Sequence, residues 1–283
     1  MRNSAATVLV LAGLAAALPE TSRAETTSAI EQVLQTDING SQRTPSFKLR
    51  DAYRHPQQTL EFFGIRPDMK VIEVLPGGGW YTEILAPFLR DYGTLYEATP
   101  ATSSTNPMFR KGAESYLKKL AASPDVYGKV ATTPFEPPEY MALGAPGSAD
   151  MVLTFLNMHD LVYTNVHKEV SDDVMDRFFQ SAFQVLKPGG VIGIVEHRAR
   201  TGQSVSDSIA LGRVPQDYLI REAQKAGFKL TGTSEVAANP KDDGNYPVWY
   251  LPPTLKLGEQ DRAKYTAIGE SDDMTLRFAK PSG

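Results

Sequence analysis

The sequence of 283 residues contains no cysteine. This absence excludes disulfide bonds, cysteine-ligated zinc, iron–sulfur clusters and thiol nucleophiles. A chain without cysteine also avoids oxidative pairing outside the cytoplasm, which agrees with export. Binding and catalysis must therefore rely on backbone groups, carboxylates, histidines and other polar side chains.

The sequence also has little positive charge. Its 29 Lys and Arg residues stand against 33 Asp and Glu residues, a formal net charge of −4 with neutral histidines. A nucleic-acid binder needs a basic surface that neutralises phosphates, so this balance argues against a nucleic-acid partner. The hydrophobic fraction of 41%, with 22 Gly and 20 Pro, is ordinary for a globular protein and excludes collagen-like and wholly disordered classes.

The apolar run near the N-terminus is too short to span a bilayer. It covers residues 7–18, whereas a spanning helix needs roughly 20 apolar residues. A basic start at Arg2 precedes it, and Ser22 and Ala24 are small residues suited to a cleavage site. This order predicts a signal peptide over residues 1–24, with a membrane anchor as the alternative. We therefore expect a periplasmic or secreted protein that has no stable membrane insertion once the leader is removed.

The rest of the chain predicts one α/β domain with an N-terminal arm. Residues 25–48 form the expected arm, and strand and helix signals alternate over residues 49–283. The expected strands cover residues 69–75, 93–97, 126–131, 149–156, 191–196, 228–236 and 274–280. The expected helices cover residues 49–63, 80–89, 106–122, 172–186 and 215–226, and residues 239–271 are expected to form a long loop or insertion.

A glycine turn follows the first expected strand. Glu73 lies near the end of that strand, and Pro76-Gly77-Gly78-Gly79 leads into a helix. Open α/β sheets bind ligands at this edge, bare backbone allows close approach, and the helix N-terminus favours a negative group. Thr82 stands where a dinucleotide fingerprint has its third glycine, which disfavours a nicotinamide cofactor. A glycine-rich turn without a ligand is the alternative.

A second acidic residue closes the next expected strand. Glu97 follows Glu73 by 24 positions. In a nucleotide site such a carboxylate accepts hydrogen bonds from ribose hydroxyls, although a strand-end glutamate can also be merely solvated. The glycine turn and the two acids together are more specific than any one of them.

Several segments resemble the class I S-adenosylmethionine-dependent methyltransferases, and more narrowly the exported bacterial branch of predicted methyltransferases. They are RDAYRHP (50–56), VIEVLPGGGWYTEIL (71–85), Asn-Met-His-Asp (157–160), LKPGG (186–190), EHRA (196–199), AGF (226–228) and the loop 239–243. The resemblance covers about residues 49–281. It implies a Rossmann-like methyltransferase fold, an α/β architecture whose mostly parallel seven-stranded sheet has helices on both faces.

The resemblance also implies S-adenosyl-L-methionine as the cofactor. Residues 73–79 match the motif around its methionine moiety, Glu97 matches the ribose-binding acid, and Phe135 follows the third strand, where such folds hold adenine. Many members have D/E-x-G-x-G-x-G, whereas Leu75 and Pro76 precede the glycines here. The full set of predicted cofactor-binding residues is Tyr53, Glu73, Pro76, Gly77, Gly78, Gly79, Glu97, Phe135 and Asn157.

Methyl transfer requires few catalytic side chains. Holding nucleophile, methyl and sulfur collinear accounts for most of the effect, and well-oriented reactions gain roughly 7–11 kcal/mol in this way. A general base helps when the acceptor is a hydroxyl or an amine. The predicted catalytic residues are Asn157, His159 and Asp160 after the fourth strand and His197 after the fifth. For each histidine, a hydrogen-bonded structural role is the alternative.

Aromatic and basic side chains near the glycine turn are further candidates. Tyr53, Arg54 and His55 precede the turn and are placed to cap a cofactor pocket, although Arg54 also suits an ordinary surface ion pair. Trp80 and Tyr81 follow the turn and suit either cation–π contact with a sulfonium or simple packing.

The spacing of the metal-ligating residue types predicts no metal site. His159, Asp160 and His167 offer imidazole and carboxylate groups, yet they lack the i, i+4 pairing of HExxH.

The sequence therefore predicts an S-adenosylmethionine-dependent methyltransferase that acts on a small-molecule acceptor by in-line displacement. An exported, non-catalytic ligand-binding protein on the same fold is the alternative, since the cofactor is made in the cytoplasm. A nicotinamide-dependent oxidoreductase is a third interpretation. The acceptor and the oligomeric state are left open by the sequence.

Overall fold

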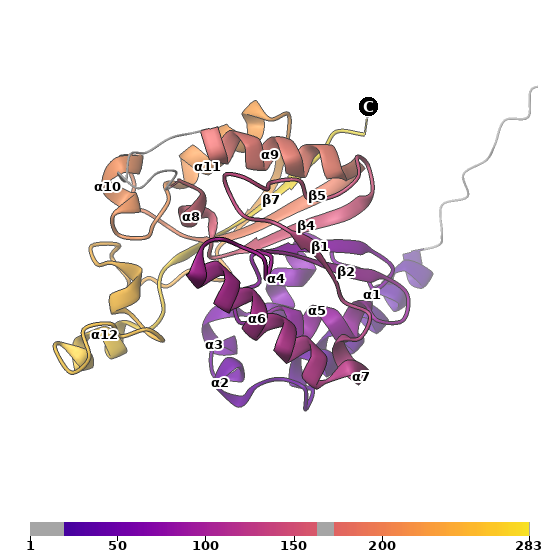
Figure 1. The fold of residues 1–283 in the computed structure, drawn as a ribbon, viewed down its shortest axis with the longest axis horizontal. Coiled ribbons are helices and arrows are strands. Elements are labelled where there is room, and N and C mark those ends of the chain that lie inside the picture. Colours follow the sequence, from indigo (N-terminus) through magenta and orange to yellow (C-terminus); the bar gives the residue numbers. More distant parts are fainter. Residues whose placement is uncertain (1–19, 163–172, 283) are drawn as a thin grey trace, which may run out of the picture.

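The computed structural model describes residues 20–162 and 173–282, with no side-chain description for residues 20–27. Its centre is a seven-stranded sheet in the order β3-β2-β1-β4-β5-β7-β6 (Figure 1). The strands are β1 (Lys70–Val74), β2 (Thr94–Thr99), β3 (Ala131–Pro134), β4 (Ala149–Phe155), β5 (Leu186–His197), β6 (Lys229–Ser234) and β7 (Asp273–Ala279). The first five strands pair in parallel, and β7 pairs antiparallel with β5 and β6. The predicted mostly parallel, seven-stranded sheet is confirmed.

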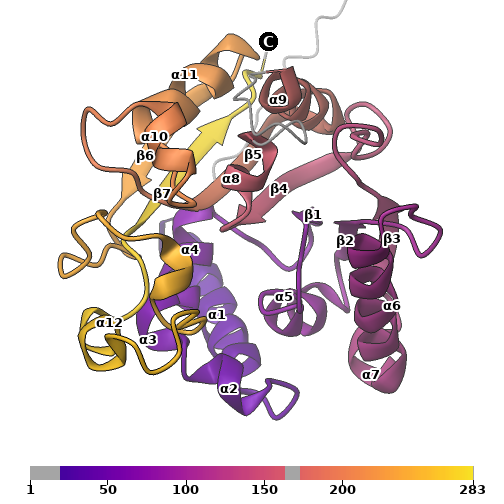
Figure 2. The same ribbon diagram turned by 60° about the vertical axis from the view of Figure 1, so that its left-hand side comes forward.

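Helices cover both faces of the sheet, as predicted (Figure 2). One face packs against α8 (Met158–Val162), α9 (Asp173–Val185), α10 (Val205–Ile209) and α11 (Gln216–Lys225). The other packs against α1 (Glu20–Asn39), α4 (Pro56–Phe63), α5 (Thr82–Leu89), α6 (Pro107–Ala122) and α7 (Pro124–Tyr127). The remaining helices are α2 (Pro45–Lys48), α3 (Asp51–Arg54), η1 (Val248–Tyr250) and α12 (Arg262–Ile268).

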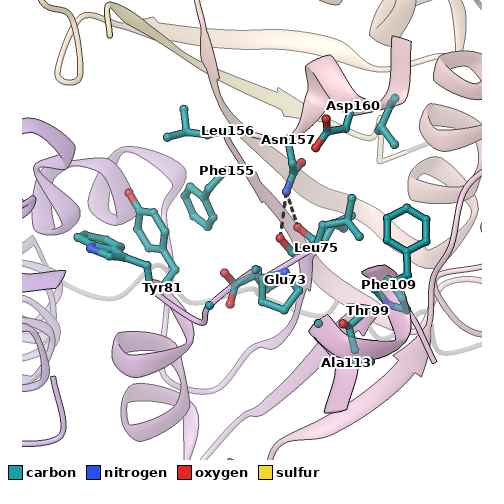
Figure 3. A pocket seen from close by; sticks show the side chains of 18 of the residues that line it. Glu73, Leu75, Tyr81, Thr99, Phe109, Ala113, Phe155, Leu156, Asn157 and Asp160 are labelled. Atoms are coloured by element: carbon teal, nitrogen blue, oxygen red, sulfur yellow. Dashed lines mark hydrogen bonds between the residues drawn. The ribbon is translucent and has the colours of Figure 1, made fainter. Parts of the chain in front are cut away.

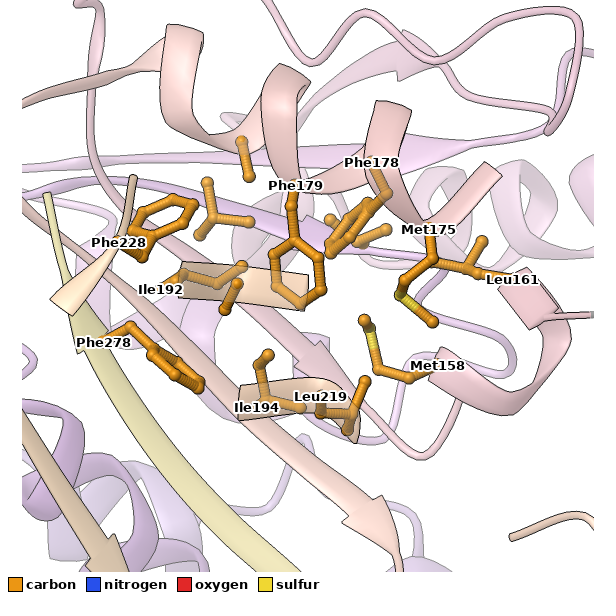
Figure 4. Packing of buried hydrophobic residues seen from close by; sticks show 14 of the residues in the cluster. Met158, Leu161, Met175, Phe178, Phe179, Ile192, Ile194, Leu219, Phe228 and Phe278 are labelled. Carbon is orange, nitrogen blue, oxygen red and sulfur yellow. The ribbon is translucent and has the colours of Figure 1, made fainter. Parts of the chain in front are cut away.

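The core on the α9 side fixes the helix that carries the candidate catalytic residues (Figure 4). Phe178 and Phe179 of α9 pack in the same cluster as the β5 residues Ile192 and Ile194. Met158 and Leu161 of α8 join this cluster and are almost wholly buried. The residues between them in sequence, 159 and 160, are therefore held at a defined place beside the ends of β4 and β5.

Three local predictions need correction. The expected strand at residues 126–131 is wrong, because α7 ends at Tyr127 and β3 begins at Ala131. The expected helix at residues 49–63 is broken at His55, whose φ of 42° is left-handed. Pro56 explains the break, since a proline disfavours the α conformation in the preceding residue. The expected loop at residues 239–271 includes η1 and α12.

The segment predicted as an N-terminal arm is packed into the domain. Its helix α1 contacts α4 and α5, and Leu34 and Ile38 are buried in the core on that side. Arg43, beyond the helix, is buried and pairs with Asp51 at 2.8 Å. Within the described residues, no helix has the length and apolar character needed to cross a membrane.

The packing of α1 predicts a clear difference between two neighbouring residues. Leu34 is 0% exposed and Val33 is 48% exposed. We expect Leu34→Ala to lower the free energy of unfolding by about 2–5 kcal/mol, because it removes buried methyl groups and leaves a cavity. Val33→Ala should leave it nearly unchanged, since alanine favours the helix and little surface is lost. Denaturant unfolding measures both, and equal values would contradict the packing of α1 on the domain.

Candidate active site

The site lies where the order of the strands reverses. The chain runs outward from β1 through β2 to β3, and β4 then returns to the other side of β1. At such a switch point the loops after the two central strands separate and leave room for a ligand at the carboxyl edge of the sheet. A cavity of about 660 Å³ occupies this place, within the usual range for small-molecule sites. Figure 3 shows it between the end of β1, the end of β4 and α6.

The turn after β1 forms the floor of the cavity. Leu75 takes a left-handed conformation with φ of 52°. Its N–H donates to the Ala98 carbonyl of β2 at 2.8 Å. Gly77 also has positive φ, and a Cβ atom there would meet nothing within 4 Å, so the cavity above this residue is open. The backbone of the turn is therefore exposed to a ligand.

Asn157 ties this turn to the end of β4. Its Nδ2 donates to the Val74 carbonyl at 2.7 Å and to the Leu75 carbonyl at 3.3 Å, as Figure 3 shows. Its Oδ1 accepts a short hydrogen bond from Thr154. Because the Asn157 amide donates to these two backbone carbonyls, its side chain holds the floor of the cavity in place.

Two buried carboxyl groups lie side by side under the turn. Glu73 and Glu97 face each other in the β1–β2 register, and Thr82 donates to Glu73 at 3.0 Å. Burial raises the pKa of Glu73 to about 7. Burial and the adjacent Glu73 carboxylate raise the pKa of Glu97 well above its ordinary value. Two carboxylates this close and this deeply buried cannot both be charged at low cost, so the pair retains a proton.

An aromatic and cationic wall faces the turn. The Tyr81 and Phe155 rings stack with centroids 3.5 Å apart, and Trp80 packs edge-on against Tyr81. The Arg54 guanidinium lies 4.7 Å from the centre of the Trp80 ring and lines the cavity. Its Nε has no hydrogen-bond partner among the described residues. Burial and then the charge of Arg50 lower the pKa of Arg54, against smaller opposing effects of Tyr81, Glu270 and Asp273.

Arg50 reaches the same wall but is fully paired. Its Nε and a terminal nitrogen bind the two carboxylate oxygens of Glu270 at 2.6 and 2.7 Å. Arg54 is only 4.0 Å from Glu270, at the limit of an ion pair. Of these two arginines, Arg54 is therefore the better placed to bind an anionic group of a ligand.

A cluster of histidines and carboxylates adjoins the cavity through Asp160. The His159 Nδ1 lies 2.8 Å from Glu196, and its Nε2 lies 3.7 Å from Asp160. The His197 Nδ1 lies 2.8 Å from Asp273 and 2.7 Å from the Ser271 hydroxyl. Burial lowers the pKa of His159, but Glu196, Asp160 and Asp273 together outweigh it and raise the pKa to about 9.

The structure brings about half of the predicted site residues into the cavity wall. Those that line it are Glu73, Pro76, Gly77, Gly78, Asn157 and Asp160. Those that do not are Tyr53, Gly79, Glu97, Phe135, His159 and His197. The predicted capping residue His55 does not line the cavity either, and the metal candidate His167 is outside the residues that the structure describes.

Three of the misplaced residues have simple physical explanations. The Phe135 side chain is 0% exposed and packs against Phe178 in the core, so the following residues 136–138 line the cavity instead. Tyr53 points to solvent and against Gly269. Glu97 does not close its strand as expected, because β2 continues to Thr99, which lines the cavity in its place.

Some residues of the site were not predicted from the sequence. Phe155 is the last residue of β4, and Glu136 follows the short strand β3. Arg50 and Glu196 open the segments RDAYRHP and EHRA, so a signal for both was present in the sequence. Asp273 has no local signal, because only the antiparallel pairing of β5 with β7 places it opposite His197.

Comparison with known proteins defines the fold of the chain. No protein-family model matches the sequence, and no curated protein matches it. Solved structures do match over most of its length, at identities that show the fold alone. The chain has the Rossmann-like methyltransferase fold, as predicted.

Three of the similar structures illustrate the range of proteins with this fold. A SAM-dependent methyltransferase from Aquifex aeolicus is 15% identical, with a TM-score of 0.51 and coverage of 88% of this chain and 97% of that chain. The cyclase SpnF is 15% identical, with a TM-score of 0.56 and coverage of 94% and 97%. Geranyl diphosphate C-methyltransferase from Streptomyces coelicolor, in complex with Mg²⁺, geranyl diphosphate and S-adenosyl-L-homocysteine, is 12% identical, with a TM-score of 0.51 and coverage of 80% and 77%.

The buried acid pair predicts that the free energy of unfolding depends on pH. Both carboxyls bind a proton more tightly in the folded state, so their contribution to stability is complete below about pH 4.5 and is lost as the pH rises through their raised pKa values, about 7 for Glu73. For Glu73 the loss is about 3 kcal/mol. Glu97→Gln removes one titrating group and its charge. We expect this variant to lose less stability than the parent between pH 4.5 and 8.

Thermal unfolding across this pH range measures the effect. Glu114→Gln, on the exposed side of α6, is the matched control and should follow the parent curve. Parallel curves for the parent and Glu97→Gln would contradict the shared proton.

Proposed function

We propose that the protein is an S-adenosylmethionine-dependent methyltransferase that acts on a small molecule. The observation that carries this proposal is the cavity of about 660 Å³ above the open glycine turn, at the switch point of the sheet. Similar folds include named SAM-dependent methyltransferases, one of them solved with S-adenosyl-L-homocysteine. The volume is sufficient for a cofactor with a small acceptor beside it.

The residues of the cavity fit the charges of such a cofactor. Glu73 provides a carboxyl group that becomes anionic when a ligand ammonium lies near it, and Arg54 provides a cation with an unpaired Nε for a ligand carboxylate. The open face of Gly77 allows the ligand to contact the backbone. When bound, S-adenosylmethionine supplies an electrophilic methyl group.

The chain's own residues then position the acceptor and exclude water. Tyr81 and Phe155 form an apolar wall beside the floor of the cavity, as Figure 3 shows. We assign to Asp160, which lines the cavity, the role of accepting a proton from the acceptor. His159 stands behind Asp160 at 3.7 Å and His197 lies beyond it, so both act on the acceptor through their neighbours.

A non-catalytic binding protein on this fold is the second candidate. The similar structure of the cyclase SpnF, which is named for a reaction other than methyl transfer, supports keeping this candidate, because a similar architecture alone does not imply methyl transfer. Turnover distinguishes the two candidates: binding of S-adenosyl-L-homocysteine without methylation of any small-molecule acceptor favours the binding protein.

We also propose that residues 1–24 are a leader and that the mature protein is exported. The support is the basic start, the apolar run of residues 7–18 and the small residues Ser22 and Ala24. N-terminal sequencing of the protein recovered from outside the cytoplasm should begin near Glu25. Recovery of the intact N-terminus inside the cell would contradict export.

The glycine turn offers a direct test of cofactor binding. Gly77→Leu places a side chain in the open cavity, and we expect it to weaken binding of S-adenosyl-L-homocysteine at least tenfold in calorimetry. Gly202→Leu is the matched control, since Gly202 also has positive φ and open space around it but lies outside the cavity. Both variants bear a similar backbone strain of about 1–2 kcal/mol.

Two outcomes would contradict the proposal. Parental affinity in Gly77→Leu would place the cofactor elsewhere. Absence of heat with both S-adenosylmethionine and S-adenosyl-L-homocysteine, in the folded parent at millimolar ligand, would exclude the methyltransferase.

A further inference from the structure

The EHRA segment at the end of β5 lies against α8 and gathers groups that methyl transfer does not require. His159, Glu196 and His197 each offer a ligand atom, and these atoms lie within 4.8 Å of one another. Asp160 lies beside this cluster, with 3.7 Å between its carboxylate and the His159 Nε2. The sequence spacing alone predicts no metal site, because the pairing of His159 with His197 depends on the adjacency of β4 and β5.

Hydrogen bonds fix the orientation of both imidazole rings. The His159 Nδ1 is held by Glu196 at 2.8 Å, and the His197 Nδ1 is held by Asp273 at 2.8 Å. Glu196 is itself fixed, because it accepts from the Met158 N–H at 2.6 Å and from the His197 N–H at 3.0 Å. A histidine that binds a metal usually donates its other ring N–H to a carboxylate in this way.

The two Nε2 atoms are left for a common ligand. Among the described residues, neither Nε2 makes a hydrogen bond. The two ring centroids are 5.3 Å apart. A metal about 2.1 Å from each nitrogen, in tetrahedral geometry, places the ring centroids roughly 5 Å apart.

The charges of the cluster favour a cation. Three carboxylates, those of Asp160, Glu196 and Asp273, surround the two imidazoles. Glu196 is 0% exposed and Asp273 is 5% exposed. Buried carboxylates in proteins are normally paired or close to a bound metal. A divalent ion at the two Nε2 atoms compensates this excess of negative charge.

We propose that His159 and His197 bind a divalent transition-metal ion beside Asp160 at the edge of the cavity, with Glu196 and Asp273 as the carboxylates that orient the histidines. Two imidazoles suit zinc, iron(II), cobalt or nickel, whereas magnesium and calcium prefer oxygen ligands throughout. Asp160, beside His159, lines the cavity, so the proposed metal site adjoins it. This proposal does not depend on methyl transfer.

Cobalt(II) is the probe that tests the site. The full chain, produced without a histidine tag and treated with a chelator, is titrated with Co²⁺ while the visible absorption is recorded. We expect one equivalent to bind with the absorption of a nitrogen- and oxygen-ligated ion, and Zn²⁺ to displace it. Elemental analysis of the reloaded protein should then give one zinc per chain.

Variants connect the binding to the proposed ligands. His159→Ala and His197→Ala should each weaken Co²⁺ binding more than a hundredfold, and Glu196→Gln should weaken it about 10–100-fold through loss of orientation. His55→Asn is the control, because His55 lies outside the cluster in left-handed backbone that asparagine tolerates. It should bind Co²⁺ like the parent.

Two results would overturn the proposal. One is the absence of stoichiometric Co²⁺ binding in the folded parent, which needs no variant to fold. The other is parental affinity in both histidine variants, with folding confirmed by circular dichroism. Binding of S-adenosyl-L-homocysteine by the chelator-treated parent is measured separately, so a failure of the metal site is distinguishable from a failure of the proposed function.

Discussion

The hydrogen bonds of Asn157 join the two strands between which the candidate site lies. Its amide binds the Val74 and Leu75 carbonyls, while Thr154 of β4 holds its oxygen. A strand end that turns away from its neighbour at a switch point has backbone carbonyls without partners in the sheet. Asn157 satisfies two of them with one side chain. The left-handed Leu75 and the open Gly77 follow directly from the turn that is held in this way.

The hydrogen bonds of Asn157 also determine where the polar side chains at the carboxyl edge of the sheet lie. The chain leaves Asn157 into α8, whose residues Met158 and Leu161 are fixed in the core. His159 and Asp160 are thereby placed between the cavity and the end of β5. On the other side of the turn, Glu73 lines the cavity with Glu97 beside it, and the pKa of each carboxyl is raised. The cavity therefore has a buried acid pair, which can ionise beside a cation, in its wall, and it adjoins the histidine cluster through Asp160.

The fold is predictable from the sequence because its signals are local. Continuous apolar runs such as residues 69–75 indicate central parallel strands, and the glycine turn indicates the ligand edge. The short strand β3 alternates between partly and fully exposed residues, so it lacks this signal and its position was wrong by several residues. For the same reason Phe135 could not be assigned to the core or the cavity without the structure.

The candidate site is less predictable, since much of it depends on contacts between distant segments. Arg50 meets Glu270 across 220 positions, and His197 meets Asp273 through the β5–β7 register. Sequence spacing identifies His159, Asp160 and His197 as polar residues at strand ends, but it does not show that both rings are anchored by carboxylates. Because both rings are anchored in this way, His159 and His197 suit the role of oriented metal ligands better than the role of catalytic bases.

The histidine cluster contains more oriented side chains than methyl transfer requires. In-line displacement gains most from positioning, and the glycine turn with the Tyr81–Phe155 wall supplies the surfaces for it. A general base needs one group near the acceptor, and Asp160 in the cavity wall can supply it. Two imidazoles, each fixed by its own carboxylate, exceed this requirement. The two fixed rings with free Nε2 atoms suit instead a metal ion that is bound through nitrogen and oxygen ligands, since the chain has no cysteine.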